Sequence, residues 1–354
     1  MHKYEGIELV KYLCDICGPT GSEERVADAV REQLDGIDGI EIKNDRGGNL
    51  IVRYPCGVEN AKTVMVSAHM DEVGMMVNDI TDDGYIKFAC LGGIDPRVLC
   101  GRGVTLMGES GDISGVIASK AIHHQTADER RTATTADKMY INIGAANKEE
   151  ALKHVAIGDS GTFRAEFYEF GNSQLCGKAL DDRLGCAVMI EVLRRLAADG
   201  TKLAYDVCFC FTTREEIGLS GAQTAAQSIA PMAAIVLETT AVADIAGVSE
   251  NSRVSKLGEG GTISLADRST IYDRRLVDLA MSTAKEQGIK AQIKKYVSGG
   301  NDAGHIHKSG AGVHALAISA PTRYLHSASC VASADDYESI KQLVYALLCG
   351  GKMI

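Results

Sequence analysis

The hydrophobic positions along the chain follow two different patterns. In one part of the chain, apolar residues recur at helical spacing over segments separated by short continuous apolar runs, which predicts helices alternating with buried strands. The helical segments are 5–17, 184–198, 219–229, 274–287 and 335–349. The clearest strand segments are "NLIVRY", "TVMVSAH", "DVCFCF", "MAAIVLE" and "VHALAIS". This alternation is typical of an α/β fold with a mainly parallel-stranded mixed sheet covered by helices on both faces.

Two further helix starts are recognisable from polar residues. Ser22 precedes the segment "EERVADAVREQL" and is a candidate N-cap, because acidic residues fill the first turn behind it. Asp181 and Asp182 precede the helix that runs to Ala198, at the end where the helix dipole favours negative charge. Both patterns predict where these helices begin.

The second pattern covers residues 73–174, where short β-like runs are separated by glycines. Examples are "GYIKFACLGG", "GRGVTLMG" and "SGDISGVIAS". Regular turn residues between short apolar runs predict a small domain that consists mostly of strands. We therefore expect a discontinuous α/β domain, residues 1–72 and 175–354, and an inserted β domain, residues 73–174.

Composition narrows the class of protein. The 354 residues suffice for two domains, and 45% of them are hydrophobic. The formal net charge of −10 argues against nucleic acid or an anionic membrane as the main partner. No apolar stretch approaches the roughly 18–20 residues that a membrane helix needs. The N-terminus carries acids and lacks the apolar region of a secretory signal.

The chain has 11 cysteines, an odd number for a disulfide framework. Several lie inside apolar runs, such as Cys208 and Cys210, as expected of reduced thiols packed in a core. We therefore expect a cytoplasmic protein.

Titratable residues cluster where the predicted strands end. The positions are His69 and Asp71, Glu215 and Glu216, Glu238, His326, and the pair Asp181 and Asp182 before a helix. The carboxyl ends of strands in an open parallel sheet line the crevice where ligands bind. Side chains far apart in sequence are therefore expected to meet there.

Carboxylates that are concentrated in one place repel one another, and a bound cation offsets that repulsion. Imidazole and carboxylate ligands suit Zn²⁺, Co²⁺ or Mn²⁺ better than Ca²⁺. Each residue taken alone has an ordinary explanation: His69 as a hydrogen-bonded core histidine, the Asp181 pair as helix caps, and a single acid as a solvated loop residue. The metal site is favoured by the number of such residues on one edge.

Five motifs occur in order along the chain: "AHMDEVG", "GKALDDRLG", "TTREEIGLSGA", "SGGNDAGHIHKSGAG" and "APTRYLHS". Together they resemble the M42 family of dinuclear metallo-aminopeptidases, the tetrahedral and glutamyl aminopeptidase group, of which some members are labelled endoglucanase. The resemblance implies a zinc-peptidase type sheet and an inserted β-barrel-like domain that mediates dimerisation. It also implies a homo-oligomer built from dimers, with a dodecamer as the expected assembly.

The resemblance also implies a role for each titratable residue. The metal ligands would be His69, Asp181, Glu216, Glu238 and His326, with Asp181 preferred over Asp182 as the residue that bridges two metals. Asp71 would orient His69, Asp182 would follow Asp181 through an unusual peptide geometry, and Glu215 would be the general base. Two positions depart from the family pattern: Glu238 replaces the usual Asp, and Cys330 replaces a common Glu.

The function that follows is removal of the N-terminal residue from short peptides. Two divalent ions per subunit, Zn²⁺ with Co²⁺ or Mn²⁺ as alternatives, would bridge a hydroxide, and Glu215 would move its proton. Arg323 and Asp302 are candidates for substrate binding, although Arg323 would equally pack its loop. The alternatives are a dinuclear deacylase or amidase on small N-acyl compounds, and a binding protein without turnover.

Overall fold

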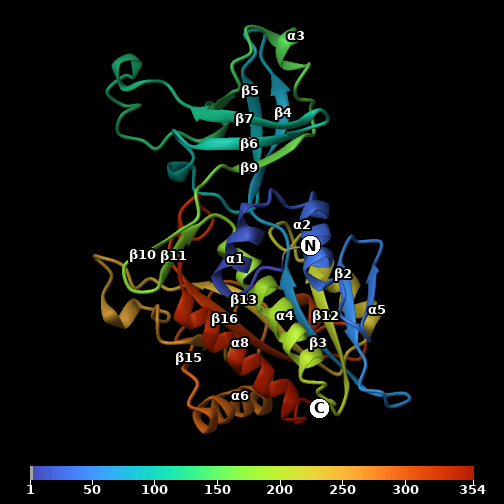
Figure 1. Ribbon diagram of the computed structural model, residues 1–354. Coiled ribbons are helices and arrows are strands. Elements are labelled where there is room, and N and C mark those ends of the chain that lie inside the picture. Colours follow the sequence, from blue (N-terminus) through green and yellow to red (C-terminus); the bar gives the residue numbers. More distant parts are fainter. Residues whose placement is uncertain (1–2) are drawn as a thin grey trace.

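The computed structural model describes residues 3–354, so residues 1 and 2 of the predicted segment 1–72 lie outside the described residues (Figure 1). Its centre is an eight-stranded sheet. In spatial order the strands are β1 (Glu41–Asn44), β2 (Leu50–Tyr54), β12 (Asp206–Thr212), β3 (Thr63–His69), β13 (Ala233–Ala241), β16 (His314–Thr322), β14 (Gly261–Ile263) and β15 (Ala291–Ile293). The four strands β12, β3, β13 and β16 pair in parallel, while β1, β2 and β14 add antiparallel pairs. The expected mainly parallel mixed sheet is therefore confirmed.

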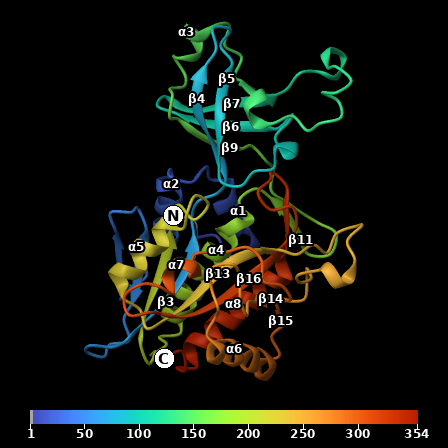
Figure 2. The same ribbon diagram turned by 180° about the vertical axis from the view of Figure 1, so that it is seen from behind.

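Helices cover both faces of this sheet (Figures 1 and 2). They are α1 (Gly6–Asp15), α2 (Glu24–Leu34), α4 (Leu180–Ala198), α5 (Ser220–Ile229), α6 (Arg274–Gln287), α7 (Ala303–Ile306) and α8 (Ala334–Cys349). On one face, α4 packs against β3 and β13 and also contacts α1 and α8. On the other face, α5 contacts β12 and β3 and lies beside α7. The apolar strands are buried on both sides as a result, and the register brings their carboxyl ends to one edge.

A second unit projects from that edge, as Figure 1 shows. It is a closed barrel of β4 (Gly74–Ile80), β5 (Ile86–Leu91), β8 (Tyr140–Asn142), β7 (Gly111–Ala118), β6 (Gly103–Gly108) and β9 (Ser160–Phe163). It has its own core, with buried Met75, Val104 and Ile141 among others. Because the barrel is closed, it has no edge strands with unpaired backbone groups, as an open sheet would have. The barrel confirms the predicted fold class.

Short elements complete the chain. They are the helix α3 (Lys148–Ala151), the 3-10 turns at Pro96–Val98, Ile122–His124, Ala136–Lys138 and Glu250–Ser252, and a small sheet of β10 (Tyr168–Phe170), β11 (Gln174–Gly177) and β17 (Cys330–Ser333). The strand β10 lies within the predicted insert, residues 73–174, but it pairs with β11 and not with the barrel. The predicted boundary at residue 174 therefore stays a prediction. Among residues 3–354, no helix has both the length and the apolar character to cross a bilayer.

Two predicted helix starts differ from the structure. Ser22 does not cap α2, because its hydroxyl lies 2.9 Å from the hydroxyl of Ser160 in the barrel, and Glu23 occupies the N-cap position. The helix α4 already begins at Leu180, and Asp181 and Asp182 interrupt its first turn with non-helical backbone angles. The two aspartates therefore do not form an ordinary cap, and the peptide bond between them is cis, as the expected unusual geometry requires.

Candidate active site

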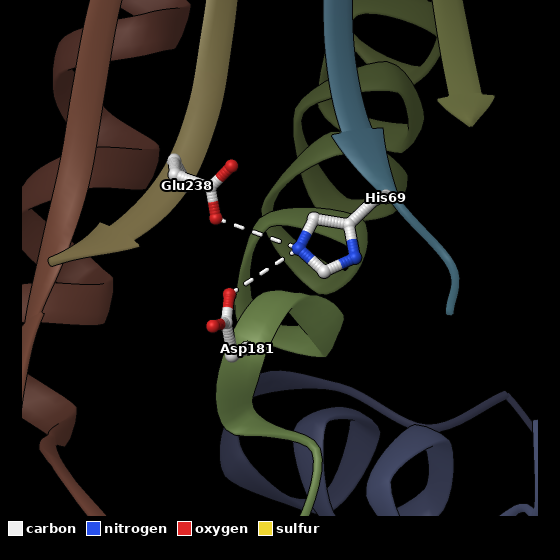
Figure 3. Close-up of side chains that lie close together, drawn as sticks. All are labelled: His69, Asp181 and Glu238. Carbon is white, nitrogen blue, oxygen red and sulfur yellow. Dashed lines mark hydrogen bonds and ion pairs between the residues drawn. The ribbon is translucent and has the colours of Figure 1, made fainter. Parts of the chain in front are cut away.

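Three residues from separate elements meet where the strands β3 and β13 approach the start of α4. His69 ends β3, Glu238 lies within β13, and Asp181 lies in the interrupted turn of α4 (Figure 3). The Nε2 atom of His69 is 3.3 Å from Asp181 Oδ1 and 3.5 Å from Glu238 Oε1. All three residues are buried. One nitrogen and two carboxylate oxygens thus face a common point.

A second group shares Asp181 with the first. The Nε2 atom of His326 is 3.4 Å from Asp181 Oδ2 and 3.4 Å from Glu216 Oε2. In both groups the donor atoms lie within 4.8 Å of one another, which is compact enough to hold a metal ion. The sequence-predicted ligands His69, Asp181, Glu216, Glu238 and His326 are therefore all brought together. The two groups meet at a single carboxylate.

The chemistry of these side chains fits divalent cations. Glu216 Oε1 and Glu238 Oε2 are buried and, within residues 3–354, accept no hydrogen bond. Burial and the neighbouring Asp181 carboxylate raise the pKa of Glu216 to about 7, and burial raises the pKa of Glu238 well above its ordinary value. Buried carboxylate oxygens without donors need a positive partner. Imidazole and carboxylate ligands suit Zn²⁺, Co²⁺ and Mn²⁺.

Backbone carbonyls orient both imidazoles. His69 Nδ1 is 3.0 Å from the carbonyl oxygen of Asp71, and His326 Nδ1 is 2.8 Å from the carbonyl oxygen of Gly93. A carbonyl can only accept, so each Nδ1 carries a hydrogen, and each Nε2 is the ring nitrogen that faces the carboxylates. Gly93 follows β5 of the barrel, and no sequence signal predicted its contribution, because any residue supplies a carbonyl.

Asp71 connects His69 to the turn that carries the two glutamates. Its Oδ1 atom is 3.5 Å from His69 Nδ1, and its two oxygens accept the backbone N–H groups of Glu215 and Glu216 at 3.0 and 3.1 Å. Burial alone would raise the pKa of the Asp71 carboxyl, but these donors outweigh it and lower the pKa below its ordinary value. Asp71 therefore stays ionised while it holds both neighbours.

Glu215 differs from Glu216 in its surroundings. It belongs to neither ligand group among the described residues. Burial, with the carboxylate of Glu238 nearby, raises the pKa of Glu215 well above its ordinary value. A carboxyl with a raised pKa takes up a proton more readily, as a general base requires. Adjacent glutamates thus have different chemical environments.

Three other predicted residues lie elsewhere. Arg323 Nε is 2.6 Å from Asp244 Oδ1 in an ion pair. Asp302 is 2% exposed and its Oδ2 accepts the Thr212 hydroxyl at 2.6 Å. Asp182 Oδ1 accepts the Gly185 amide at 3.0 Å. The structure does not bring these side chains into either ligand group, so the predicted substrate contacts of Arg323 and Asp302 stay predictions.

Comparison with known proteins shows the family to which the chain belongs. The family model described as M42 glutamyl aminopeptidase matches residues 48–343. A putative aminopeptidase of Acetivibrio thermocellus is 36% identical over 351 residues, which cover 99% of this chain and all of the relative. Both matches span the barrel as well as the sheet.

Solved structures give the same result. The crystal structure of a TET aminopeptidase from a marine sediment Thaumarchaeota archaeon superimposes with a TM-score of 0.92 at 34% identity, covering 97% of this chain and 95% of the other. The Pyrococcus horikoshii TET1 peptidase, described as assembling into a tetrahedron or a large octahedral shell, has a TM-score of 0.86 at 34% identity, with coverage of 97% and 98%. The chain therefore belongs to the M42 family of aminopeptidases, and it is a hydrolase of the exopeptidase type.

Proposed function

We propose that this aminopeptidase removes the N-terminal residue from short peptides with two divalent cations, Zn²⁺ or alternatively Co²⁺ or Mn²⁺, and Glu215 as general base. The observation that carries the proposal is Asp181, whose two oxygens face two separate histidines at 3.3 and 3.4 Å. His69 and Glu238 would complete one cation site, and Glu216 and His326 the other. A carboxylate shared in this way supports a pair of neighbouring cations.

When bound, such cations lower the pKa of water and polarise the carbonyl oxygen of the scissile peptide bond. The Glu215 carboxylate would accept the proton from the attacking water and deliver it to the nitrogen of the leaving amine. Asp71 would hold the backbone of Glu215 and Glu216 while it orients His69. The buried setting of these side chains limits competing water and strengthens their interactions.

We extend the proposal to the assembly and its location. The TET1 peptidase of Pyrococcus horikoshii is described as assembling into a tetrahedron or a large octahedral shell, which supports a homo-oligomer here. We expect this oligomer to be built from dimers that the barrel joins and to be a dodecamer. Such a shell would favour short or unfolded peptides. The 11 free cysteines support the reducing cytoplasm as the location. Light scattering should give a mass well above the 37.6 kDa of one chain.

The decisive experiment is a panel of aminoacyl-p-nitroanilides and short peptides, measured with and without added Zn²⁺, Co²⁺ and Mn²⁺. An N-acetylated copy of each good substrate serves as the matched control. We expect cleavage of the free-amine compounds only, loss of activity with a strong chelator and recovery with one of the metals. Cleavage of only the acylated compounds would instead support a deacylase, and activity that survives the chelator would overturn the proposed metal dependence.

A further inference from the structure

The turn that carries Glu215 and Glu216 is held by side chains from three distant parts of the chain. It lies between β12 and α5, and its four consecutive backbone N–H groups each donate to a side-chain oxygen. The four hydrogen bonds are Thr213 N to Asn49 Oδ1 at 3.0 Å, Arg214 N to Glu23 Oε1 at 3.0 Å, Glu215 N to Asp71 Oδ1 at 3.0 Å, and Glu216 N to Asp71 Oδ2 at 3.1 Å. We call these three acceptor side chains, Glu23, Asn49 and Asp71, the amide cradle.

The acceptors of the amide cradle are buried and fixed in place. Glu23 is 5% exposed, and the same oxygen that binds the Arg214 amide also accepts the Gly21 amide at 2.8 Å. Asn49 is fully buried, and its Nδ2 atom donates to the carbonyl oxygen of Gly221 at 2.9 Å. Because these partners are themselves constrained, the cradle sets the position of the turn and does not merely follow it.

Arg214 is the residue of the turn that needs this support most. Its backbone has a φ of 56°, in the left-handed region that costs a non-glycine residue roughly 1–2 kcal/mol. That conformation reverses the chain immediately before Glu215, and only Glu23 accepts its amide among the hydrogen bonds of the described residues. Loss of the Glu23 carboxylate would leave this amide without its acceptor next to the proposed base.

Glu23 occupies the N-cap position of α2, but its side chain makes no hydrogen bond to an amide of that helix. Capping its own helix therefore does not account for a buried carboxylate here. The carboxylate instead binds the loop before α2 and the turn after β12, and its bond to the Arg214 amide joins residues 191 positions apart in sequence. Its contacts are directed at the turn of the proposed base.

We infer that Glu23 is a positioning residue for Glu215: through the Arg214 amide it fixes the direction in which the general base leaves the turn. The inference rests on the proposed role of Glu215 and goes beyond it, since Glu23 touches neither ligand group. A misplacement of about 1 Å of a reacting group can reduce turnover about a hundredfold. The effect of Glu23 should therefore appear in kcat and leave KM and bound metal nearly unchanged.

The variants E23A and E23Q separate positioning from other roles, with E24A as the matched control because Glu24 is exposed. E23A removes the acceptor, and we expect kcat to fall by about tenfold to a hundredfold with KM and metal content close to wild type. E23Q keeps an oxygen acceptor and should recover most of the activity, while E24A should equal wild type. Equal kcat in E23A and wild type, or a loss in E23A that comes entirely from lost metal, would overturn the inference.

A double-mutant cycle with E215Q tests whether Glu23 acts through the base. Once Glu215 can no longer accept a proton, E23A should reduce the residual turnover by less than twofold, because coupled residues are not additive. If the loss of kcat in the double variant equalled the product of the losses in E23A and E215Q, Glu23 would act independently of Glu215, and the inference would be overturned.

Hydrogen exchange of the intact protein tests the positioning role of Glu23 without depending on peptidase activity. E23A should speed exchange of the backbone amides of residues 213–216, while E23Q and E24A should not. If wild type cleaved no peptide, the proposed function would fail, and faster exchange in E23A alone would still support the cradle. Unchanged exchange in E23A would overturn the positioning role even in a fully active enzyme.

Discussion

Asp181 presents one carboxylate oxygen to His69 and the other to His326: its Oδ1 atom is 3.3 Å from Nε2 of the first and its Oδ2 atom 3.4 Å from Nε2 of the second. A single short side chain thereby joins two groups of ligands whose members come from segments far apart in sequence. No other residue of the described chain belongs to both groups.

Replacing Asp181 should therefore affect both cation sites, whereas replacing a ligand of one group should affect one. We expect D181A to lose nearly all bound metal and H326A to keep about half of the wild-type metal content. Elemental analysis of dialysed protein, expressed as metal per subunit, measures this difference. Equal metal content in D181A and H326A would contradict a shared carboxylate, and circular dichroism confirms that both variants are folded.

Replacing Glu215 should separate catalysis from metal binding. E215Q keeps the shape of the side chain but cannot accept a proton, so we expect kcat to fall by about 10²–10⁴-fold with metal content unchanged. Its neighbour supplies the matched control, because E216Q should lose metal as well as activity. Undiminished turnover in E215Q would remove Glu215 from the role of general base.

A buried ion pair lies where the barrel joins the sheet. Lys178 Nζ is 2.7 Å from Glu72 Oε1, with the two side chains 6% and 3% exposed, and Thr162 of the barrel donates to Glu72 Oε2 at 3.0 Å. Replacing Lys178 by Met would leave Glu72 as a buried charge without this partner. We expect the free energy of unfolding to fall by about 3–5 kcal/mol.

Urea denaturation of K178M measures this loss, and K202M is the control because Lys202 is exposed. The double variant K178M with E72Q should recover part of the stability, since it removes the charge of Glu72, whose remaining cationic partner Arg183 is 3.7 Å away. A K178M protein as stable as wild type would show that the pair contributes nothing at the junction.

The stability of the protein should depend on pH through Asp206, the first residue of the interior strand β12. Its oxygens accept the Cys56 amide at 2.8 Å and the Arg53 guanidinium at 2.6 Å. Burial alone would raise the pKa of the Asp206 carboxyl, but these donors lower it below the ordinary 3.8. The folded state therefore favours the ionised form, so this stabilisation is present above about pH 4 and is lost as the pH falls below it.

We expect D206N to be less stable than wild type by about 1–2 kcal/mol at pH 7, and the difference to shrink toward pH 3. Chemical denaturation at the two pH values measures the change. The exposed D278N variant should show no such difference. A difference between D206N and wild type that grows on acidification would contradict the sign of the pKa shift.

The ligand residues were predictable because the signal is topological. Strands that pair in parallel end on one edge, so acids after β12 and within β13 had to approach His69 at the end of β3. The detailed roles came from the resemblance to a known family. The strand pattern likewise predicted the sheet, and the glycine-rich segment predicted a small β domain, whose barrel-like form was implied by the resemblance.

The remainder depends on partners that no local pattern reveals. Ser22 is a residue type that often caps helices, but its hydroxyl is hydrogen-bonded to the hydroxyl of Ser160 in the barrel instead. Arg323 is engaged by Asp244, and Asp302 by Thr212, through contacts between segments far apart in sequence. Glu23 and Asn49 were not singled out, because acceptors for backbone amides carry no spacing signature. Tertiary contacts decided each of these cases.

The carbonyl of Gly93 ties the barrel to the chemistry of the sheet. Deleting the insert would spare every side chain proposed to bind metal and would still remove the carbonyl that accepts the Nδ1 hydrogen of His326. A protein without the insert would consequently keep all the proposed ligand side chains, but the imidazole of His326 would be free to rotate. Exchange of barrels between relatives should succeed only where the loop after β5 keeps the carbonyl of residue 93 within hydrogen-bond distance of His326 Nδ1.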